Sequence, residues 1–149
     1  MKTMSKRAQA GLTLIEMMTV IAIAGIVAAI AIPAWLDHAS REKFSAALAE
    51  ITPGKMGVDD ALKGNKTPVL TAVTSNSELF VGVQEVNANS TVTLTGGAAA
   101  RLVARIVGGA KSVEGQTITL TRDQASGKWA CTTTVEQKYV GAVETCVGA

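Results

Sequence analysis

Glu16 is the residue of this sequence whose type and position most clearly suggest chemistry. Its carboxylate stands directly before a run of twenty residues, Met17–Leu36, that contains no ionisable side chain. A charge at the edge of a membrane helix is unfavourable unless an opposite charge pairs with it. If the chain is cut between Gly11 and Leu12, the new α-ammonium of Leu12 lies one helical turn before Glu16. In a bundle of such helices, the ammonium of one subunit can neutralise Glu16 of the next and select the axial register. The simpler alternative is a carboxylate that only marks the interfacial edge of a span.

A membrane-spanning helix is the element that would position Glu16. Twenty uncharged residues form a helix about 30 Å long, which matches the hydrocarbon core of a bilayer. Three basic residues, Lys2, Lys6 and Arg7, precede the run and predict that its N-terminal end stays in the cytoplasm. The alternative is a secretory signal cut near Ala31, but the apolar run is longer than the roughly 7–15 residues of a signal core.

The two cysteines, Cys131 and Cys146, both lie within the last twenty residues of the chain. In an exported domain they are expected to form a disulfide. The bridge would close a loop of about 16 residues and contribute roughly 3 kcal/mol on chain-entropy grounds. Two buried thiols of a cytosolic protein are the alternative, and the N-terminal segment argues for export instead.

The remaining polar residues do not indicate an enzyme or a nucleic-acid-binding protein. Without the first eleven positions the chain has 11 basic and 12 acidic side chains, a net charge of −1. The single histidine, His38, is expected at a solvated helix position, and Asp59-Asp60 is expected to be a solvated acidic pair. No phosphate-binding glycine loop or zinc-ligand spacing is present. We therefore expect no catalytic residues, no cofactor and no metal.

Beyond Leu36 the helical period continues into more polar sequence and predicts a long helix with one face on a core. Thr52-Pro53-Gly54 interrupts it, and Thr52 is expected to cap a second helical segment that begins at Pro53. That segment is expected to run to about Lys63 and to end at Gly64-Asn65. The apolar positions at helical spacing are Phe44, Leu48, Ile51, Val58 and Leu62.

The rest of the chain predicts an antiparallel sheet. Residues 65–90 suggest a loop with a short strand at Leu79–Val86. β-Branched residues at alternating positions predict further strands, at Thr91–Thr95, Leu102–Val107, Thr117–Arg122 and Lys128–Val135. In the last of these, Trp129 and Cys131 share a face, so Trp129 is expected to pack in the core beside the disulfide.

The N-terminal residues carry a resemblance to a known family. Gly11 followed by Leu-Thr-Leu-Ile-Glu, with a basic leader before it and an apolar helix after it, resembles the prepilin signature of type IV pilins of the IVa kind. The resemblance implies that a prepilin peptidase cuts after Gly11 and methylates the amine of Leu12. It implies that Glu16 is the assembly carboxylate, and that Gly25 and Pro33 are positions where the helix partly melts inside the fibre. Leu12 stands where the family usually has Phe, and its peptidases accept other apolar residues.

The resemblance also implies the fold and the course of assembly. We expect an α+β fold in which the long N-terminal helix packs on about four antiparallel strands, with a disulfide-closed C-terminal loop. Residues 1–11 would be the removed leader, 12–36 the transmembrane and assembly helix, and 37–149 the periplasmic or extracellular head. The implied partners are the inner membrane, prepilin peptidase, the pilus assembly machinery, minor pilins and further copies of the chain in a helical filament. The fibre would extend from the surface of a Gram-negative bacterium.

Other functions stay open at this point. Adhesion, twitching motility and DNA uptake belong to the assembled fibre, and the sequence does not choose among them. A minor or DNA-receptor pilin would need clustered basic residues, whereas those of the head are scattered and offset by acids: Arg101, Arg105, Lys111, Lys128 and Lys138. A type II secretion pseudopilin would be expected to have a calcium-binding C-terminal loop in place of the cysteines. A plain monotopic membrane protein would keep its leader and stay monomeric.

Overall fold

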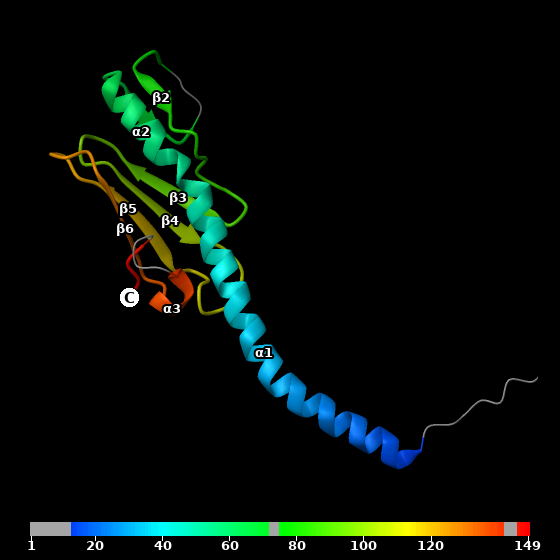
Figure 1. Cartoon of the computed structure of the whole chain (residues 1–149). Coiled ribbons are helices and arrows are strands. Elements are labelled where there is room, and N and C mark those ends of the chain that lie inside the picture. Colours follow the sequence, from blue (N-terminus) through cyan, green and yellow to red (C-terminus); the bar gives the residue numbers. More distant parts are fainter. Residues whose placement is uncertain (1–12, 72–74, 142–145) are drawn as a thin grey trace, which may run out of the picture. The chain divides into compact units, whose positions relative to one another are not determined.

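A computed structural model describes residues 13–71, 75–141 and 146–149 of the chain (Figure 1). The chain divides into two units, residues 1–35 and 36–149. Helix α1 (Leu14–Ile51) supplies the described structure of the first unit and opens the second. The second unit, called the head below, also contains all the strands and the two shorter helices.

The first unit is helical from Leu14 onward, and its apolar residues are exposed on every side. α1 continues through Gly25 and Pro33 without a break. The segment is long and apolar enough to cross a membrane, as the sequence predicts, and none of its most apolar part is buried.

In the head, α1 is followed after a single residue by α2 (Pro53–Lys63). Among the five predicted apolar positions, Phe44, Ile51 and Val58 are buried and Leu48 and Leu62 are partly buried against the core. The prediction that Thr52 caps α2 is wrong. Its backbone is helical and its hydroxyl donates to the carbonyl of Leu48 at 2.7 Å, as threonines inside helices do. The break between α1 and α2 arises because Pro53 has no N–H to donate to a carbonyl one turn earlier.

The main sheet has four antiparallel strands in the order β3-β4-β5-β6. The prediction of four antiparallel strands is confirmed. The ends of three of them are shifted by one or two residues, because alternating residue types do not define where a strand ends. The bounds are Ser90–Thr95 for β3, Arg101–Ile106 for β4, Thr117–Arg122 for β5 and Trp129–Thr133 for β6. A short helix, α3 (Gln137–Val140), follows β6.

The segment between α2 and the main sheet differs from the prediction. The expected strand at Leu79–Val86 is only three residues long, β2 (Glu78–Phe80), and it pairs in parallel with β1 (Thr67–Val69). The strand stops because the chain turns at Gly82, whose φ is 81°. Val81 and Val83, on either side of this turn, are both buried in the core. Their side chains would share a face in a regular strand as well, but here the strand pairing has already ended.

The core lies between one face of the sheet and the two helices α1 and α2 (Figure 1). Helix residues Phe44, Ala47 and Ile51 contribute to it together with Leu102, Ile118 and other alternating strand residues. The opposite face of the sheet is composed mostly of threonine. The α+β fold expected from the sequence is therefore present.

Candidate functional site

The N-terminus of α1 is closed by a reciprocal pair of hydrogen bonds between Thr13 and Glu16. The backbone N–H and the hydroxyl of Thr13 both donate to Oε2 of Glu16, at 2.8 and 2.7 Å, and the N–H of Glu16 lies 3.3 Å from the Thr13 hydroxyl oxygen. This arrangement is a capping box, which satisfies helix N–H groups that have no intrahelical partner. The other carboxylate oxygen, Oε1, accepts no hydrogen bond from the described part of the chain.

The predicted partner of Glu16 is not placed. Gly11 and Leu12, the predicted cleavage and methylation residues, lie outside the described residues. Within the described structure, Glu16 is bonded only to its own helix turn, through Thr13 and through Thr19, whose hydroxyl donates to the Glu16 carbonyl at 2.9 Å. Within the described residues, Glu16 thus has one oxygen engaged locally and one that accepts no hydrogen bond.

The apolar side chains on both sides of Glu16 in α1 form an uncovered hydrophobic surface. Their exposed fractions lie between 46% and 78%. A helix that is apolar on all sides requires lipid or other helices around it. The residues are Leu14, Ile15, Met17, Met18, Val20, Ile21, Ile23, Ile26, Val27, Ile30, Ile32 and Trp35.

Gly25 and Pro33 weaken this helix without interrupting it. A Cβ at Gly25 would meet no atom within 4 Å, so no close contact requires glycine at this position. Glycine lowers helix propensity by about 1 kcal/mol relative to alanine. Pro33 lies inside α1 and leaves the carbonyl of Ala29 without its helical donor. Both predicted sites of helix melting are therefore intact helix in this structure.

The sequence reasoning missed how the C-terminal part of α1 is attached to the sheet. Oε1 of Glu50 accepts hydrogen bonds from the backbone N–H and the side-chain amide of Asn89, at 3.0 and 2.6 Å, and Oε2 accepts from the hydroxyl of Ser90 at 2.8 Å. Nζ of Lys43 donates to Oδ1 of the same asparagine at 2.9 Å. A carboxylate that accepts several hydrogen bonds holds the start of β3 against the helix.

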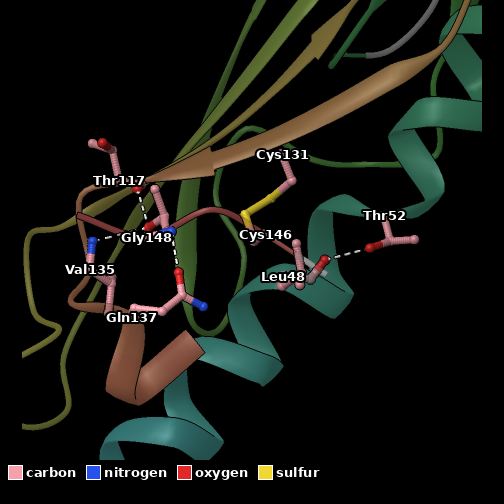
Figure 2. Close-up of a disulfide and its surroundings, with 9 residues drawn as sticks. Leu48, Thr52, Thr117, Cys131, Val135, Gln137, Cys146 and Gly148 are labelled. Atoms are coloured by element: carbon pink, nitrogen blue, oxygen red, sulfur yellow. Dashed lines mark hydrogen bonds between the residues drawn. A yellow bond between two sulfur atoms is a disulfide. The ribbon is translucent and has the colours of Figure 1, made fainter. Parts of the chain in front are cut away.

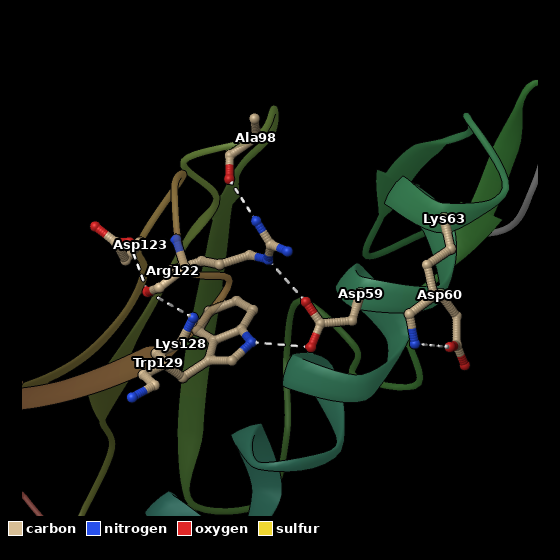
Figure 3. A network of polar contacts seen from close by, with 9 residues as sticks. Asp59, Asp60, Lys63, Ala98, Arg122, Asp123, Lys128 and Trp129 are labelled. Carbon is tan, nitrogen blue, oxygen red and sulfur yellow. Dashed lines mark hydrogen bonds and ion pairs between the residues drawn. The ribbon is translucent and has the colours of Figure 1, made fainter.

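A second polar contact attaches α2 to the other edge of the sheet (Figure 3). Nε of Arg122 lies 2.8 Å from Oδ1 of Asp59, and the indole N–H of Trp129 donates to Oδ2 at 3.2 Å. Partial burial alone would raise the pKa of Asp59, but hydrogen bonds from Arg122 and Trp129 hold it below the usual value. The prediction of a solvated acidic pair is therefore wrong for Asp59. Asp60 does point to solvent, where it pairs loosely with Lys63 at 3.8 Å.

The disulfide joins β6 to the C-terminal residues (Figure 2). Cys131 and Cys146 are bonded, with their Cα atoms 4.6 Å apart, as predicted. Backbone bonds continue the link, since Val147 donates to the carbonyl of Cys131 at 3.1 Å and accepts from the N–H of Thr133 at 2.9 Å. The side-chain amide oxygen of Gln137 accepts from the N–H of Gly148 at 2.6 Å. The C-terminus therefore covers backbone groups that β6 would otherwise expose at the edge of the sheet.

His38 and Lys138 contact residues that are close to them in sequence. His38 is exposed as predicted and lies 3.1 Å from Glu42. Lys138 pairs with Glu136 at 3.5 Å and lies over the ring of Tyr139. Arg101 and Arg105 differ from these because both project from one face of β4.

Two family profiles together span most of the chain. Residues 40–146 match the pilin family, described as a bacterial filament protein. Residues 6–32 match the prokaryotic N-terminal methylation motif. The matched segments cover most of the apolar helix and nearly the whole head.

Individual proteins show the same similarity. Fimbrial protein Q of Moraxella bovis is 41% identical over 136 residues, which cover 84% of this chain and 86% of that protein. The type IV major fimbrial protein FimA of Dichelobacter nodosus is 33% identical over 148 residues, 90% of this chain and 94% of its own length. Among solved structures, a Cs1 pilin chimera has a TM-score of 0.63 at 26% identity, over 70% of this chain and 95% of that one. The similarity therefore extends over sequence and fold.

Proposed function

Because this chain belongs to the pilin family of bacterial filament proteins, we propose that it is a membrane-anchored precursor whose mature form polymerises through its N-terminal helix. It is a structural subunit of a type IV pilus, in agreement with relatives named as type IV major pilin and major fimbrial protein. The observation that carries the proposal is the uncovered apolar helix that begins at Leu14. Lipid covers this helix in the precursor, and the helices of other subunits cover it in the fibre.

Maturation removes residues 1–11. The basic residues of this leader hold it in the cytoplasm, where a prepilin peptidase cuts after Gly11 and methylates the amine of Leu12. The match of residues 6–32 to the N-terminal methylation motif supports this processing. The mature chain then consists of the assembly helix, 12–36, and the head, 37–149.

Assembly uses Oε1, the second carboxylate oxygen of Glu16. The capping box with Thr13 engages Oε2 and orients the carboxylate at the start of α1. Oε1 then receives the α-ammonium of Leu12 from a neighbouring subunit, because a buried pair is far less costly than a buried single charge. A subunit in the wrong axial register leaves Glu16 unpaired, so the pairing selects the register.

Gly25 and Pro33 allow α1 to change length during assembly. Each position lacks the local stabilisation that an ordinary helical residue supplies. Packing between subunits can therefore melt the helix between Gly25 and Pro33 at a low cost in free energy. This melting would adjust the helical register of the fibre. The head remains unchanged because its part of α1 is held by the Glu50 and Asn89 contacts.

The surroundings of the chain follow from this course of assembly. The precursor resides in the inner membrane, and the pilus assembly machinery and minor pilins are its partners during polymerisation. The fibre then extends outside the cell, where an oxidising environment favours the Cys131–Cys146 bridge. This bridge also favours a pilin over a type II secretion pseudopilin. The role is structural, so we propose no enzymatic activity.

The intact mass of the protein in sheared fibres tests the proposal. Fibres are collected from cells, and the mass is measured with and without reductant. We expect a chain that begins at Leu12, carries one added methyl group, and lacks two hydrogens before reduction. A chain that begins at Met1, or one cut near Ala31, would refute processing into a fibre subunit.

A further inference from the structure

Two arginines of the central strand β4 stand on the sheet face opposite the helices. Leu102, Ala104 and Ile106 point into the core, so Arg101 and Arg105 project from the other face, and both are exposed. Each arginine lies between two threonines of the neighbouring strands, in rows defined by the strand register. The rows are Thr95–Arg101–Thr121 and Thr91–Arg105–Thr117.

A third row between these two contains no charge. Val103 lies between Thr93 of β3 and Thr119 of β5, and Thr132 of β6 lies beside Thr119. The three rows together are called the outer sheet face. It presents rows of threonine side chains, of which Thr119 is buried with only 7% exposed. The two arginines stand about 13 Å apart along the strand, four residues at ~3.3 Å each.

Within the described residues, the two guanidinium groups have no ionic or hydrogen-bonding partner. Arg122, the arginine on the inner face, is paired with Asp59. By contrast, neither Arg101 nor Arg105 forms an ion pair or hydrogen bond within the described residues. The outward-facing positions of the four strands contain no acid. The acid just beyond β5, Asp123, has its Oδ1 engaged by the N–H and hydroxyl of Ser126, at 2.7 and 2.6 Å.

We propose that the outer sheet face binds a linear acidic polysaccharide. Each free guanidinium would bind a carboxylate or sulfate group of the polymer in a bidentate manner. The flanking threonine hydroxyls both donate and accept hydrogen bonds, as sugar hydroxyls do. The electrostatic complementarity comes from two cations on a face without carboxylates.

The composition of the face favours a polysaccharide over DNA. The hydroxyl rows far outnumber the cations, which suits a polymer with many hydroxyls and spaced anionic groups. A phosphodiester backbone offers acceptors only, and affinity for DNA rises with the number of phosphates that lysine and arginine neutralise. A single subunit has two such cations, so its binding is expected to be weak. Repetition along the proposed fibre would add avidity, and only this part of the inference rests on the proposed function.

The test uses the full-length chain in nonionic detergent, so that binding is measured independently of fibre formation. Labelled alginate supplies carboxylates and heparin supplies sulfates, while dextran is the neutral control and double-stranded DNA the nucleic-acid control. The double variant Arg101→Gln/Arg105→Gln removes the two cations. The matched variant Lys66→Gln/Lys111→Gln removes two exposed cations from elsewhere on the head. Thermal melting of each variant verifies that the head is folded.

We expect at least one of the two acidic polysaccharides, alginate or heparin, to bind more tightly than dextran and DNA. The arginine double variant is expected to lose about tenfold in affinity, whereas the lysine double variant stays within about twofold. Thr95→Val/Thr121→Val keeps both charges and is expected to weaken binding by a smaller factor. Equal losses in both charge variants, tighter binding to DNA, or no binding to either acidic polysaccharide would overturn the proposal. Failure of the mass measurement on fibres would leave these binding results unaffected.

Discussion

Nε of Arg122 donates to Oδ1 of Asp59 at 2.8 Å and joins β5 to α2 across 63 residues of sequence. Trp129 of the neighbouring strand donates to the other oxygen of the same carboxylate. Both side chains of the ion pair are largely shielded, with exposed fractions of 18% for Arg122 and 28% for Asp59. This contact and the Glu50–Asn89 contact attach the two helices to opposite edges of the sheet.

Asp59→Asn is expected to destabilise the head at neutral pH by about 1–3 kcal/mol, because it leaves a partly buried arginine without its anion. The pKa of Asp59 is lowered in the folded chain, so the wild-type pair stabilises the fold above the ordinary aspartate pKa of about 4. The contribution is lost as the pH falls through the lower, folded-state pKa. Urea unfolding of both proteins at pH 7 and pH 3 measures the difference.

Asp60→Asn is the matched control for this experiment. Asp60 and Lys63 are 65% and 78% exposed, and such surface pairs contribute little. We expect its stability to match the wild type at both pH values. If the two asparagine variants had the same stability at pH 7, the contact with Arg122 would contribute nothing to the fold.

Gly57→Ala is expected to destabilise the head although alanine is the better helix former. A Cβ at position 57 would overlap the backbone of Val81, which cannot move aside as a flexible side chain can. The gain in helix propensity is about 1 kcal/mol, and overpacking of this kind typically costs about 1–3 kcal/mol or more. Thermal unfolding is the measurement, with Gly25→Ala as the control, since that position has open space around it. Equal unfolding temperatures for the two variants would contradict the close approach of α2 to Val81.

The elements that could be predicted from the sequence are those with a local signal. Thr117–Arg122 has the bounds expected from its alternation because Ile118 and Leu120 face the core and threonines face outward. The helical segments of the head could be predicted because Phe44, Ile51 and Val58 repeat at helical spacing. The capping box also has a local signal, Thr13 followed three residues later by Glu16, although the adjacent membrane segment points only to the charge of Glu16.

The features that were missed depend on residues distant in sequence. Nothing near Asp59 indicates that Arg122 will neutralise it, so its solvation was predicted wrongly. The parallel pairing of β1 with β2 involves three residues on each strand, too few for an alternating pattern to be recognised. Thr52 has the residue type and position of a cap, yet its backbone is helical and its hydroxyl donates to a carbonyl one turn earlier instead of capping α2.

Cys131→Ser is expected to loosen the C-terminal residues and lower the stability of the head by roughly 3 kcal/mol. The backbone bonds of Val147 to β6 remain possible, but the covalent link that keeps them closed is lost. Thermal unfolding and protease resistance are compared for Cys131→Ser, Cys146→Ser and the double variant. All three should lose the same amount, and reductant should bring the wild type to their level. Unchanged stability in every variant would show that the bridge has no effect on the head.

Glu16→Gln separates the two roles of the Glu16 carboxylate. Glutamine can maintain the hydrogen bonds of the capping box but cannot neutralise an ammonium group. We therefore expect Glu16→Gln and Glu16→Ala to be inserted and cleaved normally, yet to give sharply reduced fibre yields. Thr13→Val removes the hydroxyl of the cap and retains the charge, so its yield should lie much closer to the wild type. The ratio of sheared fibre to cell-retained mature chain is the measurement. A normal yield from Glu16→Gln together with a poor yield from Thr13→Val would mean that helix capping, and not charge pairing, is what assembly requires of this residue.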